Sequence, residues 1–431
     1  MKDEMSWQLI GLLTAMILVL LGVMAGPLFS QALPWMANTQ TFSTAFADQL
    51  EVTLSYNSLH DEYLVVWVVG DGAVLKIAGI RVGSDGIPIG NVTILSPENG
   101  LNQFNPDVAY DAVNDQYLVV WTFDYYGDGS DYDVVGKFIP WNNLATGQAF
   151  QIDGRVGYQY RPAVVYTPET LNFYLVYQDD TSGAFEISGC TVAADGGSVG
   201  TVLGISGGLG GYRNARIAWN SRSQRYLVVY DGPPPDACGM AAIGRQLTST
   251  GAPVAAEFNI SSASYSEGAF PDVTSCRGNY LVSFSTADNG GASTYGCFRL
   301  ISDLGLPSPT ASCPTPEQQF WTYTSVDCSE GSGEYLLTWA SSFSGTGWTS
   351  MAIMGAFIDS SGNAGDNFTL YGTPDDLDYY SPAVASGAGG KALVSWLSER
   401  PPSGGAWDIR GRLVGNILFA DDFESGDTSL W

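Results

Sequence analysis

Acidic and aromatic side chains recur in this 431-residue sequence beside short apolar runs, at regular spacings. Carboxylates follow apolar runs of the type Tyr63-Leu64-Val65-Val66-Trp67 in six places: Asp71, Asp124, Asp179 with Asp180, Asp231, Asp288 and Glu399. Aromatic rings precede a second set of apolar runs, of the type Pro106-Asp107-Val108-Ala109-Tyr110, in six places: Phe104, Tyr160, Tyr212, Phe270, Tyr323 and Tyr380. Aromatic rings stack on the apolar faces of sugars, and carboxylates accept hydrogen bonds from hydroxyl groups. These residue types therefore predict a surface that binds a saccharide or a peptide.

The ligand-binding candidates combine these rings, three neighbouring aromatics and two of the acids. They are Phe104, Tyr158, Tyr160, Tyr212, Phe270, Trp321, Tyr323, Tyr379, Tyr380, Asp179 and Asp288. Each residue also has a structural alternative, because an aromatic ring can fill space between sheets and an aspartate after a strand often forms a local turn. For the surface as a whole we favour binding, since loops on a rigid scaffold commonly carry function.

One acidic loop suggests a metal ion. Asp124, Asp128, Asp131 and Asp133 lie within ten residues, and Gly129 permits a tight turn among them. Calcium prefers several oxygen ligands on one loop, so calcium is the one cofactor that the sequence suggests. The pattern of an EF-hand is absent, because no acid stands two residues after Asp124 and no late glutamate completes the set. A solvated acidic loop is the alternative.

The sequence contains no recognisable set of catalytic residues. His60 is the sole histidine and lies in a turn-like segment, which disfavours a histidine-dependent triad or a multi-histidine metal site. With 44 acidic residues, no particular carboxylate pair stands out as the acid and base of a hydrolase. We therefore assign no catalytic residue.

The net negative charge disfavours two classes of partner. The chain has 17 basic and 44 acidic residues, a formal net charge of −27. Nucleic acids and anionic lipid surfaces are bound through Lys and Arg, so both are disfavoured.

A repeat positions these residues. The run Tyr63-Leu64-Val65-Val66-Trp67 returns six times in related form, and its closing aromatics fall at positions 67, 121, 177, 230, 284, 339 and 396. A glycine within a later apolar strand keeps the same interval, as at Gly79 and Gly136. Each unit reads as four short strands, the second apolar throughout, as expected for a strand covered on both faces. We expect the strand-three glycine to admit a bulky aromatic side chain from a neighbouring sheet. Seven such units predict an all-β fold, a seven-bladed β-propeller of four-stranded antiparallel blades.

The units also resemble a known family. Pro106-Asp107-Val108-Ala109-Tyr110, the run ending at Trp121 and Asp408-Ile409-Arg410-Gly411-Arg412-Leu413-Val414 resemble the blade repeats of secreted bacterial propellers. The resemblance covers about residues 50–416. It implies the fold and export from the cytoplasm, and it brings no catalytic residue with it.

Two ways of closing the ring are open. Gly415-Asn416 could turn a hairpin that supplies the last outer strand locally. Alternatively, Phe42-Ser43-Thr44-Ala45-Phe46 could return from the N-terminus and occupy that position.

The N-terminal sequence predicts an apolar helix before the propeller, and this helix predicts export. Leu9–Phe29 is an apolar run long enough to span a bilayer, and Ser30-Gln31-Ala32 offers the small residues of a signal-peptidase site. A cleaved signal peptide and an uncleaved anchor are both consistent with it, and both place the remainder outside the cytoplasm. We divide the chain into residues 1–37 (signal peptide or anchor), 38–419 (propeller) and 420–431 (acidic tail). The six cysteines suggest disulfides, and Cys297–Cys313 is the most local candidate pair.

Three functional hypotheses follow. The first is an extracytoplasmic, non-enzymatic module that binds a glycan or a protein, without nucleic acid and with membrane contact only through an uncleaved N-terminal segment. The second is a polysaccharide-active hydrolase or lyase that uses acidic residues on the loop-rich face. The third is a purely structural component of the cell surface.

Overall fold

The computed structural model describes most of the chain from Pro34 onward, which is one compact unit. The described residues are 34–43, 49–70, 74–97, 99–196, 198–208, 210–233, 240–261, 267–287, 294–315, 323–342, 351–372, 379–399 and 407–416. The predicted N-terminal apolar helix and the predicted acidic tail lie outside these residues, and the three-part division of the chain stays a prediction. Within the described part, no helix has the length and apolar character needed to cross a membrane.

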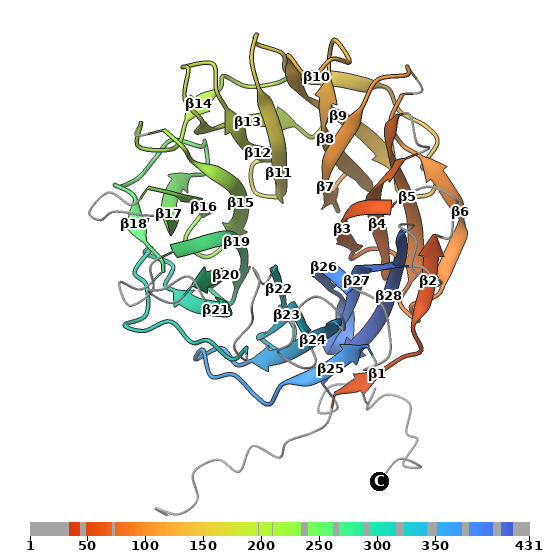
Figure 1. The fold of residues 1–431 in the computed structure, drawn as a ribbon, viewed down its shortest axis with the longest axis vertical. Coiled ribbons are helices and arrows are strands. Elements are labelled where there is room, and N and C mark those ends of the chain that lie inside the picture. The colour runs from red at the N-terminus through yellow and green to blue at the C-terminus, as the bar shows by residue number, and fades with distance from the viewer. Residues whose placement is uncertain are drawn as a thin grey trace, which may run out of the picture. The chain divides into compact units, whose positions relative to one another are not determined.

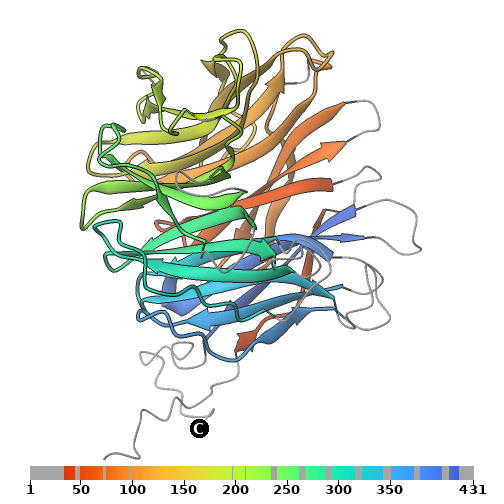
Figure 2. The same cartoon turned by 60° about the vertical axis from the view of Figure 1, so that its left-hand side comes forward.

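Seven antiparallel sheets are arranged around a central axis (Figure 1). In six sheets, strands consecutive in sequence are neighbours and the first of them lies innermost. The seventh sheet keeps this order for its last three strands and gains two strands from the N-terminal side at its outer edge. Figure 2 shows the strands of each sheet running side by side. The predicted seven-bladed β-propeller is therefore confirmed.

The blades follow one another in chain order. Blade 1 contains β3 (Gln49–Asn57), β4 (Glu62–Gly70), β5 (Leu75–Gly83) and β6 (Pro88–Ile94). Blade 2 contains β7 (Gln103–Asp111), β8 (Gln116–Asp124), β9 (Tyr132–Pro140) and β10 (Ala149–Asp153). Blade 3 contains β11 (Gln159–Thr167), β12 (Asn172–Asp179), β13 (Glu186–Ala193) and β14 (Leu203–Gly204). Blade 4 contains β15 (Arg213–Asn220), β16 (Arg225–Gly232), β17 (Ala241–Thr248) and β18 (Phe258–Asn259).

The remaining three blades are less uniform. Blade 5 contains β19 (Glu267–Cys276), β20 (Asn279–Ala287) and β21 (Thr294–Ile301). Blade 6 contains β22 (Thr324–Ser329), β23 (Glu334–Ser342), β24 (Met351–Ile358) and β25 (Phe368–Tyr371). Blade 7 contains β26 (Tyr379–Ser386), β27 (Lys391–Glu399) and β28 (Trp407–Gly415), with the short 3-10 helix η1 (Ala388–Gly390) before β27. Two strands from the start of the described chain, β1 (Trp35–Met36) and β2 (Gln40–Ser43), pair with β28.

The second strand of each blade packs on both faces, as its apolar sequence predicts. In β4, Tyr63, Val65 and Trp67 pack toward blade 7, while Leu64 and Val66 pack toward blade 2. All five side chains are buried. Because successive residues of a strand point to opposite faces, an unbroken apolar run requires a neighbouring sheet on each side.

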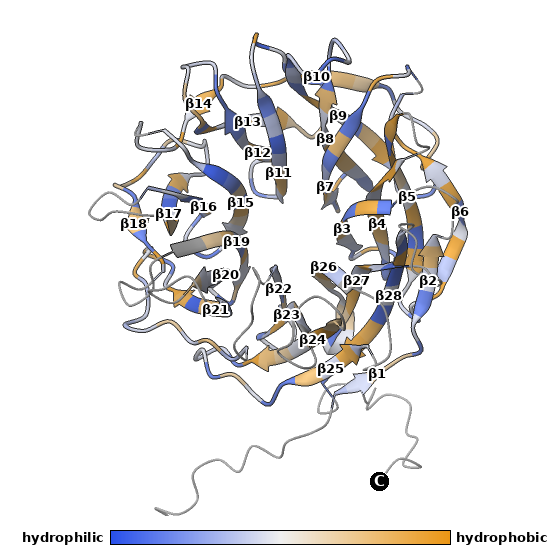
Figure 3. Ribbon diagram, in the orientation of Figure 1, coloured by the Kyte–Doolittle hydropathy of each residue, from blue (hydrophilic) through white to orange (hydrophobic). Residues whose placement is uncertain are grey.

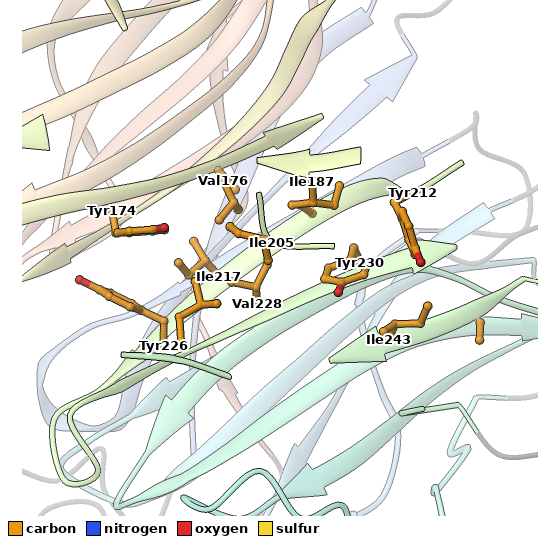
Figure 4. Packing of buried hydrophobic residues seen from close by; sticks show 14 residues of the cluster. Tyr174, Val176, Ile187, Ile205, Tyr212, Ile217, Tyr226, Val228, Tyr230 and Ile243 are labelled. Carbon is orange, nitrogen blue, oxygen red and sulfur yellow. The ribbon is translucent and has the colours of Figure 1, made fainter. Parts of the chain in front are cut away.

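The core of the protein is divided among the seven contacts between adjacent blades. Each of the seven buried apolar clusters combines residues of two neighbouring blades. Figure 4 shows the cluster between blades 3 and 4, where Tyr174 and Tyr226 point toward each other. Their ring centroids are 4.9 Å apart. No blade has a core of its own, so each depends on its neighbours for burial.

The strand-three glycines make room for a different neighbour from the one predicted. A β-carbon added to Gly79 would lie 2.9 Å from Leu95, and one added to Gly136 would lie 2.8 Å from Ile152. Both contacting side chains lie at the outer end of the same blade, whereas we expected an aromatic side chain from a neighbouring sheet. The glycine therefore lets the outer segment pack closely onto its own sheet.

Blade 7 is closed by the N-terminal segment. Gln40 and Thr41 pair with Gly411 and Arg410 on the outer edge of β28. Phe42 is 4% exposed, and its ring occupies the space that a β-carbon at Gly411 would fill. Phe42 thus takes the position that outer-strand side chains hold in other blades. Of the two predicted closures, the N-terminal one is confirmed, although its strand begins at Gln40.

Blade 5 departs from the four-stranded pattern. Its outer segment makes only isolated bridges to β21 in the described residues, between Phe298 and Ser312 and between Ile301 and Pro307. The Cys297–Cys313 disulfide lies beside the first of these bridges, as predicted. Pro307, Pro309 and Pro314 occur in this outer segment. Proline has no N–H group to donate to a strand ladder, which explains the lack of a regular fourth strand in the described part of blade 5.

A second disulfide joins blades 5 and 6. Cys276 at the end of β19 is bonded to Cys328 in β22, with the Cα atoms 5.9 Å apart. Cys190 is a buried free thiol. Cys238 lies outside the described residues.

The closure of blade 7 gives a stability prediction. Phe42→Ala leaves a cavity beside Gly411 and should lower the free energy of unfolding by about 3–5 kcal/mol. Chemical denaturation followed by tryptophan fluorescence measures this change. Val113→Ala is the matched control, because Val113 is 58% exposed in the turn after β7. Equal denaturation midpoints for the Phe42 variant and the wild type would contradict this closure.

Candidate functional site

The innermost strands of all seven blades enclose a cavity of about 530 Å³ along the propeller axis. These strands are β3, β7, β11, β15, β19, β22 and β26. The ribbons around the opening carry both hydrophilic and hydrophobic segments (Figure 3). Small-molecule sites occupy cavities of roughly 300–1,000 Å³ in which a few polar groups fix the ligand, so the axial cavity is the first place to look for a site.

A repeated backbone irregularity marks one end of this cavity. In six blades the innermost strand contains a non-glycine residue in the left-handed conformation, with φ between 48° and 54°. These residues are Glu51, Asn105, Arg161, Asn214, Phe270 and Ser381. The strand register shifts at each of these positions. Each is therefore a β-bulge, which re-aims a side chain.

All six bulge residues line the cavity near the start of their strands. Tyr323 of blade 6, just before β22, lines it as well. We call these seven residues the mouth ring: Glu51, Asn105, Arg161, Asn214, Phe270, Tyr323 and Ser381. A left-handed non-glycine residue costs roughly 1–3 kcal/mol, and such strain clusters at functional sites. Its repetition in six blades makes the mouth ring the strongest candidate site in the described part of the molecule.

Blades 1 to 4 contribute a polar half to the mouth ring. Asn105 donates from its backbone N and its Nδ2 to the two oxygens of Glu51, each at 2.6 Å. Arg161 Nη1 donates to Asn214 Oδ1 at 2.5 Å, and Asn214 Nδ2 donates to Asp231 Oδ1 at 2.8 Å. Burial raises the pKa of Glu51, against the opposing hydrogen bond from Asn105 and the charge of Arg161. Burial also raises the pKa of Asp231, to about 6.

Blades 5 and 6 contribute an aromatic half. The rings of Phe270 and Tyr323 lie with centroids 4.7 Å apart and planes tilted by 51°. Tyr323 is 41% exposed, whereas most aromatic rings of the fold are buried. An exposed ring at the mouth of a polar cavity can stack on the apolar face of a sugar.

Further along the axis, aspartates join neighbouring blades. Asp107 accepts hydrogen bonds from Thr53 Oγ1 of blade 1 at 2.9 Å and from Val164 N of blade 3 at 2.8 Å. Asp272 of blade 5 accepts one from Val326 N of blade 6 at 3.0 Å. These carboxylates accept hydrogen bonds from backbone and side-chain donors and thereby link the inner strands of adjacent blades.

Asp327 does the same between three blades. It accepts from Thr274 Oγ1 at 2.8 Å and from Ser386 N at 2.7 Å. Burial raises the pKa of Asp107 and of Asp272, and it raises the pKa of Asp327 to about 6. The native protein therefore holds a proton on these carboxyls more tightly than the unfolded chain does.

Arg216, like Arg161, is a basic residue that lines the cavity. It is exposed to the cavity, and its guanidinium makes one hydrogen bond within the described residues, from Nη1 to Ala215 O at 3.2 Å. Its charge lowers the pKa of Glu51, Asp107 and Asp272, partly offsetting the effect of their burial. One guanidinium thus compensates carboxyls from blades 1, 2 and 5.

The predicted ligand-binding aromatics separate into two groups. Phe270 and Tyr323 belong to the mouth ring. Phe104, Tyr158 and Tyr160 instead surround Tyr132, with ring centroids 5.2, 5.1 and 6.3 Å from it. Tyr132 was not among the candidates, and it brings these rings together between blades 2 and 3.

Other candidates have contacts typical of packing. Tyr212 is fully buried in the cluster between blades 3 and 4. Tyr380 packs against Trp407, with centroids 5.2 Å apart. Trp321, Asp288 and the side chain of Tyr379 lie outside what the structure describes.

Asp179 forms an ion pair. Its Oδ2 lies 2.6 Å from Arg155 Nη2 and accepts a hydrogen bond from Ser188 Oγ at 2.7 Å. Burial would raise the pKa of Asp179, but hydrogen bonds from Thr181, Ser188 and Arg155 hold it below the usual value.

The acidic loop of blade 2 distributes its carboxylates among local donors. Asp124 accepts from Gly127 N and Gly129 N, and Asp128 accepts from Ser130. Asp131 accepts from Gly157 N at 2.8 Å, and Asp133 accepts from Gln151 Nε2 at 2.7 Å. Burial raises the pKa of Asp133. Across the described ranges, no group of three or more Asp, Glu, His or Cys side chains is arranged to hold a metal ion.

Sequence reasoning missed three of the seven mouth-ring residues by one position: Asn105, Arg161 and Ser381. Asn105 and Arg161 directly follow the predicted Phe104 and Tyr160, whereas Phe270 is itself the bulge residue. The available signal was the repeated position next to each aromatic. A one-residue change of register in a strand decides which side chain faces the cavity.

Comparisons with known proteins agree on the fold. No family model and no curated protein sequence matches the chain. A protein of unknown function from Dyadobacter fermentans is similar with a TM-score of 0.50 and 12% identity, over 72% of this chain and 94% of that one. The phage phi92 endosialidase gives a TM-score of 0.53 and 11% identity over 90% and 70% of the two chains.

A puromycin hydrolase gives a TM-score of 0.54 and 13% identity, over 85% of this chain and 52% of that one. Identities this low concern the fold alone. The protein is thus a seven-bladed β-propeller whose neighbours share its architecture, and its function is argued from its own residues.

The raised pKa of Asp327 gives a pH prediction. The native state binds a proton at this carboxyl up to about pH 6, whereas an unfolded aspartate releases it near pH 4. Its contribution to the free energy of unfolding should therefore fall as the pH rises from about 4 to about 6 and be level above. The difference in unfolding free energy between wild type and Asp327→Asn, measured from pH 4 to 8, follows this contribution.

Asp366→Asn, on an exposed turn, is the control for loss of one negative charge. A difference between wild type and Asp327→Asn that is level or rises between pH 4 and 6 would refute the assignment.

Proposed function

We propose that this protein is an extracytoplasmic, non-enzymatic binding module that takes a glycan at the mouth ring. The observation that carries the proposal is the set of six left-handed bulges, which aims polar and aromatic side chains into one cavity. Carboxylate, amide and guanidinium groups on one half can hydrogen-bond hydroxyl groups, and Phe270 with Tyr323 can stack on a sugar ring. The presentation of such groups on a rigid scaffold supports recognition.

Several observations support the extracytoplasmic location. The described residues contain two disulfides, which persist in oxidising compartments. The sequence begins with a predicted export segment, and the blade units resemble those of secreted bacterial propellers. A protein ligand and a purely structural role are the alternatives, and the binding experiment separates them from the glycan proposal.

An enzyme acting on polysaccharides is a second candidate because of two carboxyls, Glu51 in the mouth ring and Asp231, which accepts a hydrogen bond from the mouth-ring residue Asn214. Burial raises the pKa of Glu51 and brings that of Asp231 to about 6, which suits a general acid near neutral pH. Release of new reducing ends from a polysaccharide, abolished by Glu51→Gln, would support it. Glycan binding without product would support the module.

The binding prediction uses the two aromatic residues of the ring. On a broad glycan array, we expect the full-length protein to bind, and Tyr323→Ala or Phe270→Ala to weaken the affinity by about tenfold. Tyr126→Ala is the matched control, since Tyr126 is 63% exposed on the β8–β9 loop. Absence of binding to any glycan would reject the proposal and direct the search to protein partners of the cell surface.

Calcium binding by the Asp124–Asp133 loop stays a prediction. The same array, run with calcium and then with a chelator, tests it. Calcium-dependent binding that Asp128→Asn removes would make the loop part of the site.

A further inference from the structure

Two features of the cavity indicate the class of ligand: an acidic lining, and a guanidinium that makes few hydrogen bonds within the described residues. Four carboxyls line the cavity: Glu51, Asp107, Asp272 and Asp327. Among the lining residues, all in the described part of the chain, Arg161 and Arg216 are the only basic side chains. The lining is therefore acidic on balance, as is the whole protein at −27.

Both arginines line the same cavity as the four carboxyls. Arg216 stabilises the ionised forms of Glu51, Asp107 and Asp272, and Arg161 does the same for Glu51. A ligand carboxylate at Arg216 would compete with these groups and be repelled by them, at a cost that is large where water is scarce.

The hydrogen-bond donors of Arg216 are, by contrast, largely unused. A guanidinium has five N–H groups, and that of Arg216 makes one hydrogen bond within the described residues. Donors that share their cavity with four carboxyls suit a neutral oxygen, such as a hydroxyl or ring oxygen, better than an anion. The carboxyls beside it can accept the hydroxyl hydrogens in return.

Resting on the glycan-binding function proposed above, we propose that the cavity selects uncharged sugars, with Arg216 as the central hydrogen-bond donor, and rejects carboxylated ones. Arg216 contacts ligand oxygens through its fork of N–H groups. Asp107 and Asp272 set the specificity by repelling a ligand carboxylate, and Phe270 with Tyr323 provides the stacking surface that both kinds of sugar share.

The test compares matched oligosaccharides that differ only at C6. Neutral galactose and glucose oligomers are paired with the galacturonate and glucuronate oligomers of equal length and linkage, and affinities for the full-length protein are measured by calorimetry. We expect neutral oligomers to bind at least about tenfold more tightly than their uronate partners at low salt. Added sodium chloride should reduce this ratio, because it screens the repulsion.

Two variants separate donors from charge. Arg216→Lys keeps the charge that compensates the carboxyls but loses the planar fork, so affinity for the neutral oligomers should fall about tenfold. Asp272→Asn removes one repelling charge and should narrow the neutral-to-uronate ratio. Thermal melting of both variants verifies that they fold.

Each outcome is decisive. Equal or tighter binding of the uronates would overturn this inference and leave the glycan-binding function standing. Unchanged neutral binding by a folded Arg216→Lys variant would remove Arg216 from the site. Binding of neither member of any pair, and of nothing on the broader array, would reject the proposed function itself.

Discussion

Burial between adjacent blades is the interaction on which the whole structure depends. Every buried apolar cluster is shared by two neighbouring sheets, so a single blade would expose both faces of its second strand. Such a sheet gains stability only when flanked on both sides, and a closed ring is the arrangement in which every sheet has two neighbours. The large repeated aromatics, such as Trp67 and Trp121, each pack toward the preceding blade. This single direction of packing gives successive blades the same relative placement.

Closure of that ring makes the cavity possible and explains its chemistry. Seven inner strands around an axis leave a space that side chains only partly fill, and their residues there contact water or one another. Asp107, Asp272 and Asp327 use this position to bind the backbone N–H groups of adjacent inner strands. The same carboxyls make the cavity acidic, which gives Arg216 its role as their counter-charge. Structural cohesion and the proposed ligand preference therefore involve one set of residues.

The N-terminal strands and two disulfides add links to blades 5, 6 and 7. β1 and β2 supply the outer edge of blade 7, so the last blade is held by residues far away in sequence. In blade 5, where prolines replace the regular outer strand, Cys297–Cys313 ties that segment to the sheet. Cys276–Cys328 links the inner strands of blades 5 and 6 across the seam. Both disulfides constrain the unfolded chain, which stabilises the folded ring.

The fold was predictable from the sequence because its information is periodic. The spacing of Trp67 and its counterparts, the apolar second strands and the strand-three glycines define seven sheets without reference to any distant contact. The candidate site was predictable only in part, since Phe270 and Tyr323 were identified but Glu51, Arg161 and Arg216 were not. A bulge shifts the strand register by one residue, and composition does not show where it occurs.

The sequence by itself determined the number of blades, the burial of each second strand and the acidic character of the protein, because these follow from local pattern and composition. Tertiary structure alone decided which end of the chain closes blade 7 and which seven side chains meet at the mouth ring. It also placed the guanidinium of Arg216 where its charge lowers the pKa of carboxyls from three blades. The physical reason is that these relations depend on the axis about which the sheets are arranged, and residues more than 50 positions apart become neighbours only when whole blades pack around that axis.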